Sequence, residues 1–173
     1  MDKLIQSLRF FFMATTEDSR SDRIGNEELL DRHLVGLFAP TEPLAGAEEA
    51  LCRWVDEIAH RDVVVVSGFQ SPLEKLALEK LLAAGSSVVM VLGRSLYKRI
   101  PTKLLKPLEE GKVLIISASR LPRNSYRSSQ TRNWYIADNV QELVFLPFPQ
   151  SSALSTLYYT YSHYSNILVK ILP

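Results

Sequence analysis

Short runs of apolar residues alternate along the chain with segments in which apolar residues recur every three or four positions. The clearest runs are Val63–Val66 and Val88–Leu92, and because they are continuous they predict strands buried on both faces of a sheet. Similar runs occur at Leu34–Phe38, Val113–Ile116, Leu143–Leu146 and Ile167–Ile171. Strands that are buried on both faces are typical of a parallel sheet.

The segment after Val63–Val66 carries the clearest helix signal. Ser71 can cap a helix there, Pro72 suits the first turn and Glu74 completes a capping box. One side is expected to cover the sheet and the other to face away; the first holds Leu73, Leu76, Ala77 and Leu81, and the second holds Glu74, Lys75, Glu79 and Lys80. Gly85 is a plausible end. Further helices are expected over Ala45–Ala59, Thr102–Glu110, Ser128–Ala137 and Ser152–Tyr161.

Regular alternation of strands and helices predicts an α/β protein with a Rossmann-like three-layer sandwich. Its mainly parallel sheet is expected to have about six strands, with helices on both faces. We expect one domain over residues 33–173, preceded by a helix and loop lead-in over residues 1–32, in which Thr15–Asn26 is polar. Ligands of such sheets bind beyond the carboxyl ends of the strands. The loops expected there are 39–41, 67–71, 93–95, 117–127 and 148–152.

Charge is distributed unevenly although the net charge is only +1. The segment from Arg94 to Arg132 contains ten basic and two acidic residues, which leaves a net charge of −7 for the rest of the chain. Such an asymmetry indicates a surface that faces a polyanion. The alternative is a solvated basic helix with scattered loop arginines.

Other features limit the class of protein. The single cysteine, Cys52, is expected to be a small buried residue and fits a reducing, cytoplasmic location. No apolar run reaches the roughly 18 to 20 residues that span a bilayer. The sequence has no G-x-G-x-x-G and no Walker A motif, and its three histidines lack metal-ligand spacing. We therefore assign no cofactor, no metal and no catalytic residue.

Several stretches in unbroken order resemble the DprA/Smf DNA-processing family of the SLOG/LOG superfamily. Val65–Glu74 is similar to that family's V-V-S-G-L-A-R-G-I-D, and Val91–Gly93 to its V-L-G. Arg132–Ala137 is similar to its R-N-R-x-I-A segment, and Ser151–Thr156 is a weaker match to S-G-S-L-I-T. The chain departs from the family at Ala39–Thr41, where the family has G-S-R, and at Trp134, where it has a second arginine.

The resemblance implies a Rossmann-like domain that binds single-stranded DNA in a basic pocket and assists a recombinase. The candidate binding residues are Ser67, Gly68, Gln70, Ser71, Gly93, Arg94, Arg120, Arg127, Arg132 and Asn133. Arg132 and Asn133 suit phosphate and a base or ribose edge; the alternative is that Arg132 pairs with a carboxylate and Asn133 caps a helix. The loop 67–71 can present helix amino-terminal N–H groups to an anion, or be only a tight turn capped by Ser71.

Aromatic residues leave further alternatives open. Tyr126 can stack on bases, whereas Trp134 and Tyr135 are expected to pack in the core. The tyrosines near the carboxyl terminus, Tyr158, Tyr159, Tyr161 and Tyr164, can form a dimer surface or one side of a partly buried helix.

Three functions are compatible with these residues. The favoured one is a binding module for single-stranded DNA or a nucleotide, with a possible homodimer and a possible recombination protein as partners. The second is a degenerate scaffold protein. The third is a hydrolase of a nucleotide derivative with Glu74 as its general base.

Overall fold

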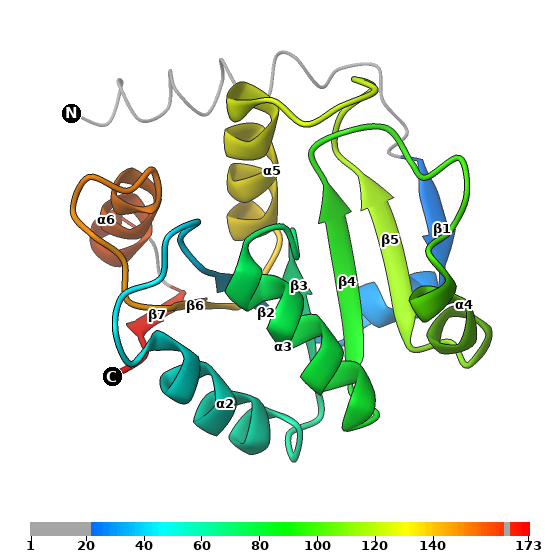
Figure 1. The fold of residues 1–173 in the computed structure, drawn as a ribbon, viewed down its shortest axis with the longest axis horizontal. Helices are drawn as coiled ribbons and strands as arrows, with labels where there is room; N and C mark the ends of the chain where they lie inside the picture. Colours follow the sequence, from blue (N-terminus) through cyan, green and yellow to red (C-terminus); the bar gives the residue numbers. More distant parts are fainter. Residues whose placement is uncertain (1–21, 165–166) are drawn as a thin grey trace.

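Among the residues that the structure describes, seven strands form one sheet in the order β1-β5-β4-β3-β2-β6-β7 (Figure 1). The structure is a computed structural model that describes residues 22–164 and 167–173. The strands are β1 (Arg23–Gly25), β2 (His33–Phe38), β3 (Val63–Ser67), β4 (Ser87–Leu92), β5 (Val113–Ser117), β6 (Glu142–Phe145) and β7 (Leu168–Ile171). The helices are the 3-10 helix η1 (Glu27–Asp31) and the α-helices α2 (Ala47–Ile58), α3 (Pro72–Ala83), α4 (Thr102–Glu109), α5 (Tyr126–Asp138) and α6 (Leu154–Tyr164).

The predicted Rossmann-like sandwich is confirmed, and all six predicted strands are present in parallel pairs. The seventh strand, β1, is a correction, because it lies within the stretch 15–26 that was expected to be a loop. It pairs antiparallel with β5, with Arg23 opposite Ile116 and Gly25 opposite Leu114. Three residues without an apolar run carry no strand signal of their own, so β1 depends on the edge of β5 that it pairs with.

Two apolar clusters lie on opposite faces of the sheet. Residues from α2, α3 and α4 pack on one face, and residues from η1, α5 and α6 pack on the other. The helices that follow β2, β3 and β4 therefore cover one face, and those that follow β5 and β6 cover the other. The direction of winding changes between β4 and β5 and between β2 and β6, which are the places where such folds bind ligands.

Two expectations about single side chains are wrong. Glu74 does not face away from the sheet but is 5% exposed, and Cys52 is half-buried rather than buried. The tyrosines of α6 are mainly packing residues: Tyr161 is buried and Tyr158 contacts Phe145, while Tyr159 is exposed. The side chain of Tyr164 and the predicted amino-terminal helix lie outside the described residues.

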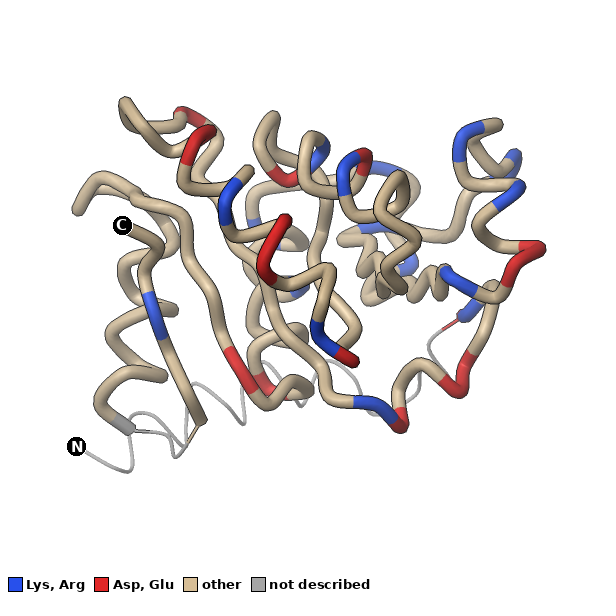
Figure 2. Tube along the Cα trace, turned by 90° about the horizontal axis from the view of Figure 1, so that it is seen from below, with Lys and Arg blue, Asp and Glu red and all other residues tan. Residues whose placement is uncertain are grey.

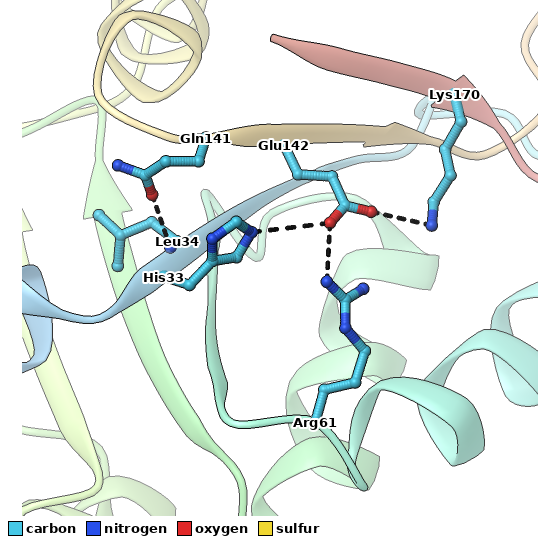
Figure 3. Close-up of polar contacts among 6 residues, drawn as sticks. All are labelled: His33, Leu34, Arg61, Gln141, Glu142 and Lys170. Carbon is cyan, nitrogen blue, oxygen red and sulfur yellow. Dashed lines mark hydrogen bonds and ion pairs between the residues drawn. The ribbon is translucent and has the colours of Figure 1, made fainter.

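An ion cluster around Glu142, the first residue of β6, joins this strand to its neighbours in the sheet (Figure 3). The buried carboxylate of Glu142 lies 2.9 Å from the Lys170 ammonium on β7 and 3.0 Å from the Arg61 guanidinium before β3. The His33 ring nitrogen is 3.8 Å away. Burial by itself raises the pKa of Glu142, but the hydrogen bonds and charges of Lys170 and Arg61 outweigh it, so the pKa lies below its ordinary value.

Candidate nucleic-acid interface

The five loops predicted to form the binding edge all follow parallel strands and therefore lie at the same edge of the sheet. The loop after β5 is joined to the loop after β4, since Ser95 N–H donates to the Leu121 carbonyl at 2.7 Å. The Ser117 hydroxyl reinforces this link at 2.9 Å from the Arg94 carbonyl oxygen. The chain then runs from this edge into α5, whose first turns lie beside the turn after β3.

The turn after β3 is held by Glu74. Its carboxylate accepts hydrogen bonds from the backbone N–H groups of Ala39 at 3.2 Å, Gln70 at 2.8 Å and Ser71 at 3.3 Å. Ser71 in turn caps α3, so the predicted capping box is confirmed. The carboxylate of Glu74 therefore fills the anion position that the sequence left open for a ligand at this helix terminus.

Phe69 shapes the same turn. Its φ angle is +48°, in the left-handed region, and its ring is buried among the apolar residues of the α2–α4 face. A non-glycine residue in this conformation costs about 1 to 3 kcal/mol and persists where the surroundings require it. Burial of the ring holds the strained turn, which aims Gln70 N–H at Glu74.

Arg132 enters this turn from the second turn of α5. A side chain on Gly68 would bring its Cβ within 2.6 Å of the Arg132 Cζ and Nε atoms, so the guanidinium occupies the space that the glycine leaves. Asn133 Oδ1 accepts from Arg132 Nε at 3.2 Å and from Nη2 at 2.9 Å. Arg132 Nη1 is buried and finds no hydrogen-bond partner among residues 22–164 and 167–173.

The positive charge of Arg132 is buried. Burial lowers the pKa of the guanidinium, and the negative charge of Glu74 partly opposes this effect. An arginine remains protonated in proteins even so. The site therefore contains a fixed buried cation whose Nη1 donors are unsatisfied within the described residues.

Gln70 and Gly93 connect this centre to the loop after β5. The Gln70 side chain donates to the Gly68 carbonyl at 3.1 Å and accepts from Asn124 Nδ2 at 3.2 Å. A Cβ on Gly93 would lie 3.0 Å from the Ser128 carbonyl oxygen and 3.1 Å from Asn124 Oδ1. Gly93 thus permits close approach of α5, a packing role that the sequence did not distinguish from ligand contact. Sequence reasoning missed Asn124.

The outer rim is basic and partly apolar. Arg120, Arg123 and Arg127 are exposed, and no acidic residue occurs between Glu110 and Asp138. Tyr126 is 76% exposed. Arg94 instead lies over the Tyr97 ring, with its Cζ 4.4 Å from the ring centroid.

The remaining predicted residues have local roles. The Ser67 hydroxyl accepts from Phe69 N–H at 3.3 Å and is fully buried. Trp134 and Tyr135 pack against the α5–α6 face, as expected. The structure therefore brings Gly68, Arg132 and Asn133 together, whereas the side chains of Ser67 and Ser71 serve the turn and the helix cap.

Two further findings concern the described residues only. No group of three or more His, Cys, Asp or Glu side chains there could hold a metal ion, and no helix there is long and apolar enough to cross a bilayer. Glu74 is a poor general base, because both of its carboxylate oxygens already accept backbone hydrogen bonds.

Fold and site define a doubly wound α/β protein with a buried arginine and a basic rim at the carboxyl edge of its sheet. No protein-family model matches the sequence, and no curated protein matches it either. Solved structures of DNA processing protein A (DprA) share the fold, which confirms the fold that the motif resemblance implied.

The Helicobacter pylori DprA structure, which concerns a single-stranded DNA binding mode, has a TM-score of 0.69 and 21% identity over 87% of this chain and 70% of that one. The Streptococcus pneumoniae DprA structure has a TM-score of 0.58 and 17% identity over 71% of this chain. The match spans only 44% of the S. pneumoniae chain.

Proposed function

We propose that this protein binds single-stranded nucleic acid at the carboxyl edge of its sheet, with one backbone phosphate held by Arg132. The observation that carries the proposal is the buried guanidinium of Arg132, whose Nη1 has no hydrogen-bond partner in the part of the chain that the structure describes. Leaving a buried donor unsatisfied costs about 1 to 3 kcal/mol, and more when the group is charged. Because Nη1 is buried, a phosphate oxygen would reach it only after the groups that cover it move aside, and it would then satisfy Nη1 with a charge-assisted hydrogen bond.

The contacts of Arg132 support a positioned rather than a merely structural cation. Asn133 holds two of its three nitrogens and so fixes the plane of the guanidinium. The negative charge of Glu74 acts on Arg132, but the two side chains do not form a salt bridge. The protein therefore orients the Arg132 guanidinium through Nε and Nη2, while the Nη1 donors stay unused among the described residues.

The outer rim supports an extended strand as the ligand. Arg120, Arg123 and Arg127 can neutralise further phosphates, and the exposed Tyr126 ring offers a surface for base stacking. Stacking on an aromatic side chain contributes about 1 to 3 kcal/mol per base and tolerates any sequence. Single-stranded DNA also agrees with the ligand of the H. pylori DprA structure.

Fluorescence anisotropy of a labelled oligothymidylate tests this proposal. Arg132→Met keeps the packing of the side chain and removes the phosphate donor, so binding should weaken about tenfold or more, which is 1.4 kcal/mol or more. Arg127→Gln at the rim should weaken binding less, since an exposed charge contributes less than a desolvated one. Lys80→Gln, at the far end of α3, is the matched control and should bind like the parent.

Two outcomes would overturn the proposal. One is parent-like binding by a folded Arg132→Met variant, and the other is no oligothymidylate binding by the parent at low salt. Mononucleotides added as competitors distinguish a nucleotide pocket from a strand-binding edge, because only a pocket ligand would displace the oligomer completely. A cytoplasmic location, a homodimer and a recombination partner also remain predictions for this chain.

A further inference from the structure

The two faces of the sheet are covered unequally. Three α-helices, α2 to α4, cover one face, whereas among the described residues the other face carries α5, α6 and the short η1. In Figure 1, α5 and α6 lie to the left of β4, β5 and β1. The part of the second face over β4 and β5 is bounded by α5 on one side and by β1 and η1 on the other.

A cavity of about 140 Å³ lies in this position. Val89, Val91 and Ile116 of β4 and β5 form its apolar floor. Tyr135 on α5 and Arg23 on β1 line it from the two bounding elements. Arg23, Tyr135 and Asn139 make part of the lining polar, so the apolar floor is the part that suits an inserted apolar side chain. A cavity of about 150 Å³ has room for a group the size of benzene.

The position of the chain's own amino-terminal segment favours it as the occupant. Residues 1–21, which lie outside the described residues, join the structure at Asp22, whose carbonyl oxygen accepts from Ser117 N–H at 2.9 Å. The next residue, Arg23, already lines the cavity. A segment tethered at the cavity has an effective concentration in the millimolar range and needs little intrinsic affinity.

The sequence of this segment matches the cavity. Its apolar residues are Leu4, Ile5, Leu8, Phe10, Phe11, Phe12 and Met13. Leu4, Leu8 and Phe11 recur at the spacing of one helix face. The eight residues between Met13 and Asp22 span up to roughly 25 Å when extended, enough to place Phe11 or Phe12 at the cavity.

We propose that residues 4–13 dock over β4 and β5, between α5 and β1, and insert one apolar side chain into this cavity. The proposal is independent of the nucleic-acid site, because none of the cavity residues belongs to that site.

Paramagnetic relaxation in the full chain tests the docking. A nitroxide is attached at Ser7→Cys in a Cys52→Ser background, and methyl signals of the core are recorded. Val89, Val91 and Ile116 methyls should broaden strongly. Leu51 and Val55 on α2 lie in the helix layer on the opposite side of the sheet, so they are the control and should keep most of their intensity.

A second variant keeps the test decisive. Adding Leu8→Asp and Phe11→Asp to the labelled chain changes no described residue, and it should abolish the broadening while leaving the core spectrum intact. Equal broadening on both faces, broadening that survives these substitutions, or none in the parent would overturn the proposal. So would broadening that appears only between labelled and unlabelled chains in a mixture, since the segment would then dock on a second copy.

Discussion

Gly68 and Arg132 act as a pair at the candidate site. The guanidinium lies where a Gly68 side chain would be, and Asn133 keeps it there. Because Gly68 is not at a positive φ angle, its backbone does not require glycine. The requirement comes from the neighbouring cation, which makes the need for glycine conditional on Arg132.

This dependence predicts that the effect of Gly68→Ala on the free energy of unfolding changes sign when Arg132 is replaced. Gly68→Ala should destabilise the parent by about 1 to 3 kcal/mol, because the added methyl group overpacks a buried site. In an Arg132→Ala background the same substitution should stabilise the protein by about 0.4 to 1 kcal/mol, since alanine lowers the conformational entropy of the unfolded chain. Urea unfolding of the four proteins measures both effects, and equal costs in the two backgrounds would contradict the pairing.

Glu142 gives the protein a defined acid sensitivity. Because its folded pKa lies below the unfolded one, its contribution to stability is complete above the unfolded value of about 4.3. That contribution is lost as the pH falls through the folded pKa. Glu142→Gln should therefore lower the free energy of unfolding near pH 7 by about 1 to 3 kcal/mol. The free energy of unfolding of this variant should also decrease less than that of the parent as the pH falls.

Urea midpoints between pH 7 and pH 3 measure this effect. The exposed Glu109→Gln is the control, because it removes the same charge far from Lys170 and Arg61. An acid profile of Glu142→Gln that runs parallel to that of the parent would show that other carboxylates determine the acid response.

At the scale of elements, α3 depends on its cap. Ser71 accepts from Glu74 N–H at 3.3 Å and satisfies one of the donors that a helix start leaves unpaired. Ser71→Ala should lower the free energy of unfolding by about 1 kcal/mol and Ser71→Gly by only a few tenths. The midpoint of urea unfolding should shift without a change in slope. Equal losses in the two variants would argue against capping as the role of Ser71.

The sequence predicted the elements that carry strong local signals. The parallel strands contain runs of apolar residues, and the Ser71–Glu74 box is a local pattern, so both were identified before the structure. The start of α5 was placed two residues late, because its capping box uses Ser125 and Ser128 rather than an acidic residue. Strand β1 has no local signal at all and forms through pairing with β5.

The candidate site was predictable only in part. The motif resemblance identified Gly68, Arg132 and Asn133, but their mutual contact depends on the loop after β5, which brings α5 beside the turn after β3. Glu74 was assigned to the solvent side by helix periodicity, because that pattern contains no information on backbone donors beyond the helix. Its hydrogen-bond donor Ala39 N–H lies directly after β2, 35 residues away in sequence.

At the scale of the whole molecule, basic positions gather in more than one place. In Figure 2, lysine and arginine positions around α4 at the right lie beside acidic ones, and acidic positions are prominent along α2 at the upper left. A second basic group, Arg120, Arg123 and Arg127, lies at the carboxyl edge of the sheet. Net charge alone therefore does not determine where a polyanion binds.

Salt dependence distinguishes the two basic regions. A strand that contacts three to five phosphates should give a slope of log K against log salt of about −2 to −3.5. Replacing Arg120, Arg123 and Arg127 with glutamine should reduce the magnitude of the slope by about 2. Replacing Lys103, Lys106 and Lys112, which lie around α4, removes the same charge and should leave the slope nearly unchanged. Equal reductions in the two triple variants would mean that binding follows net charge rather than the arginine rim.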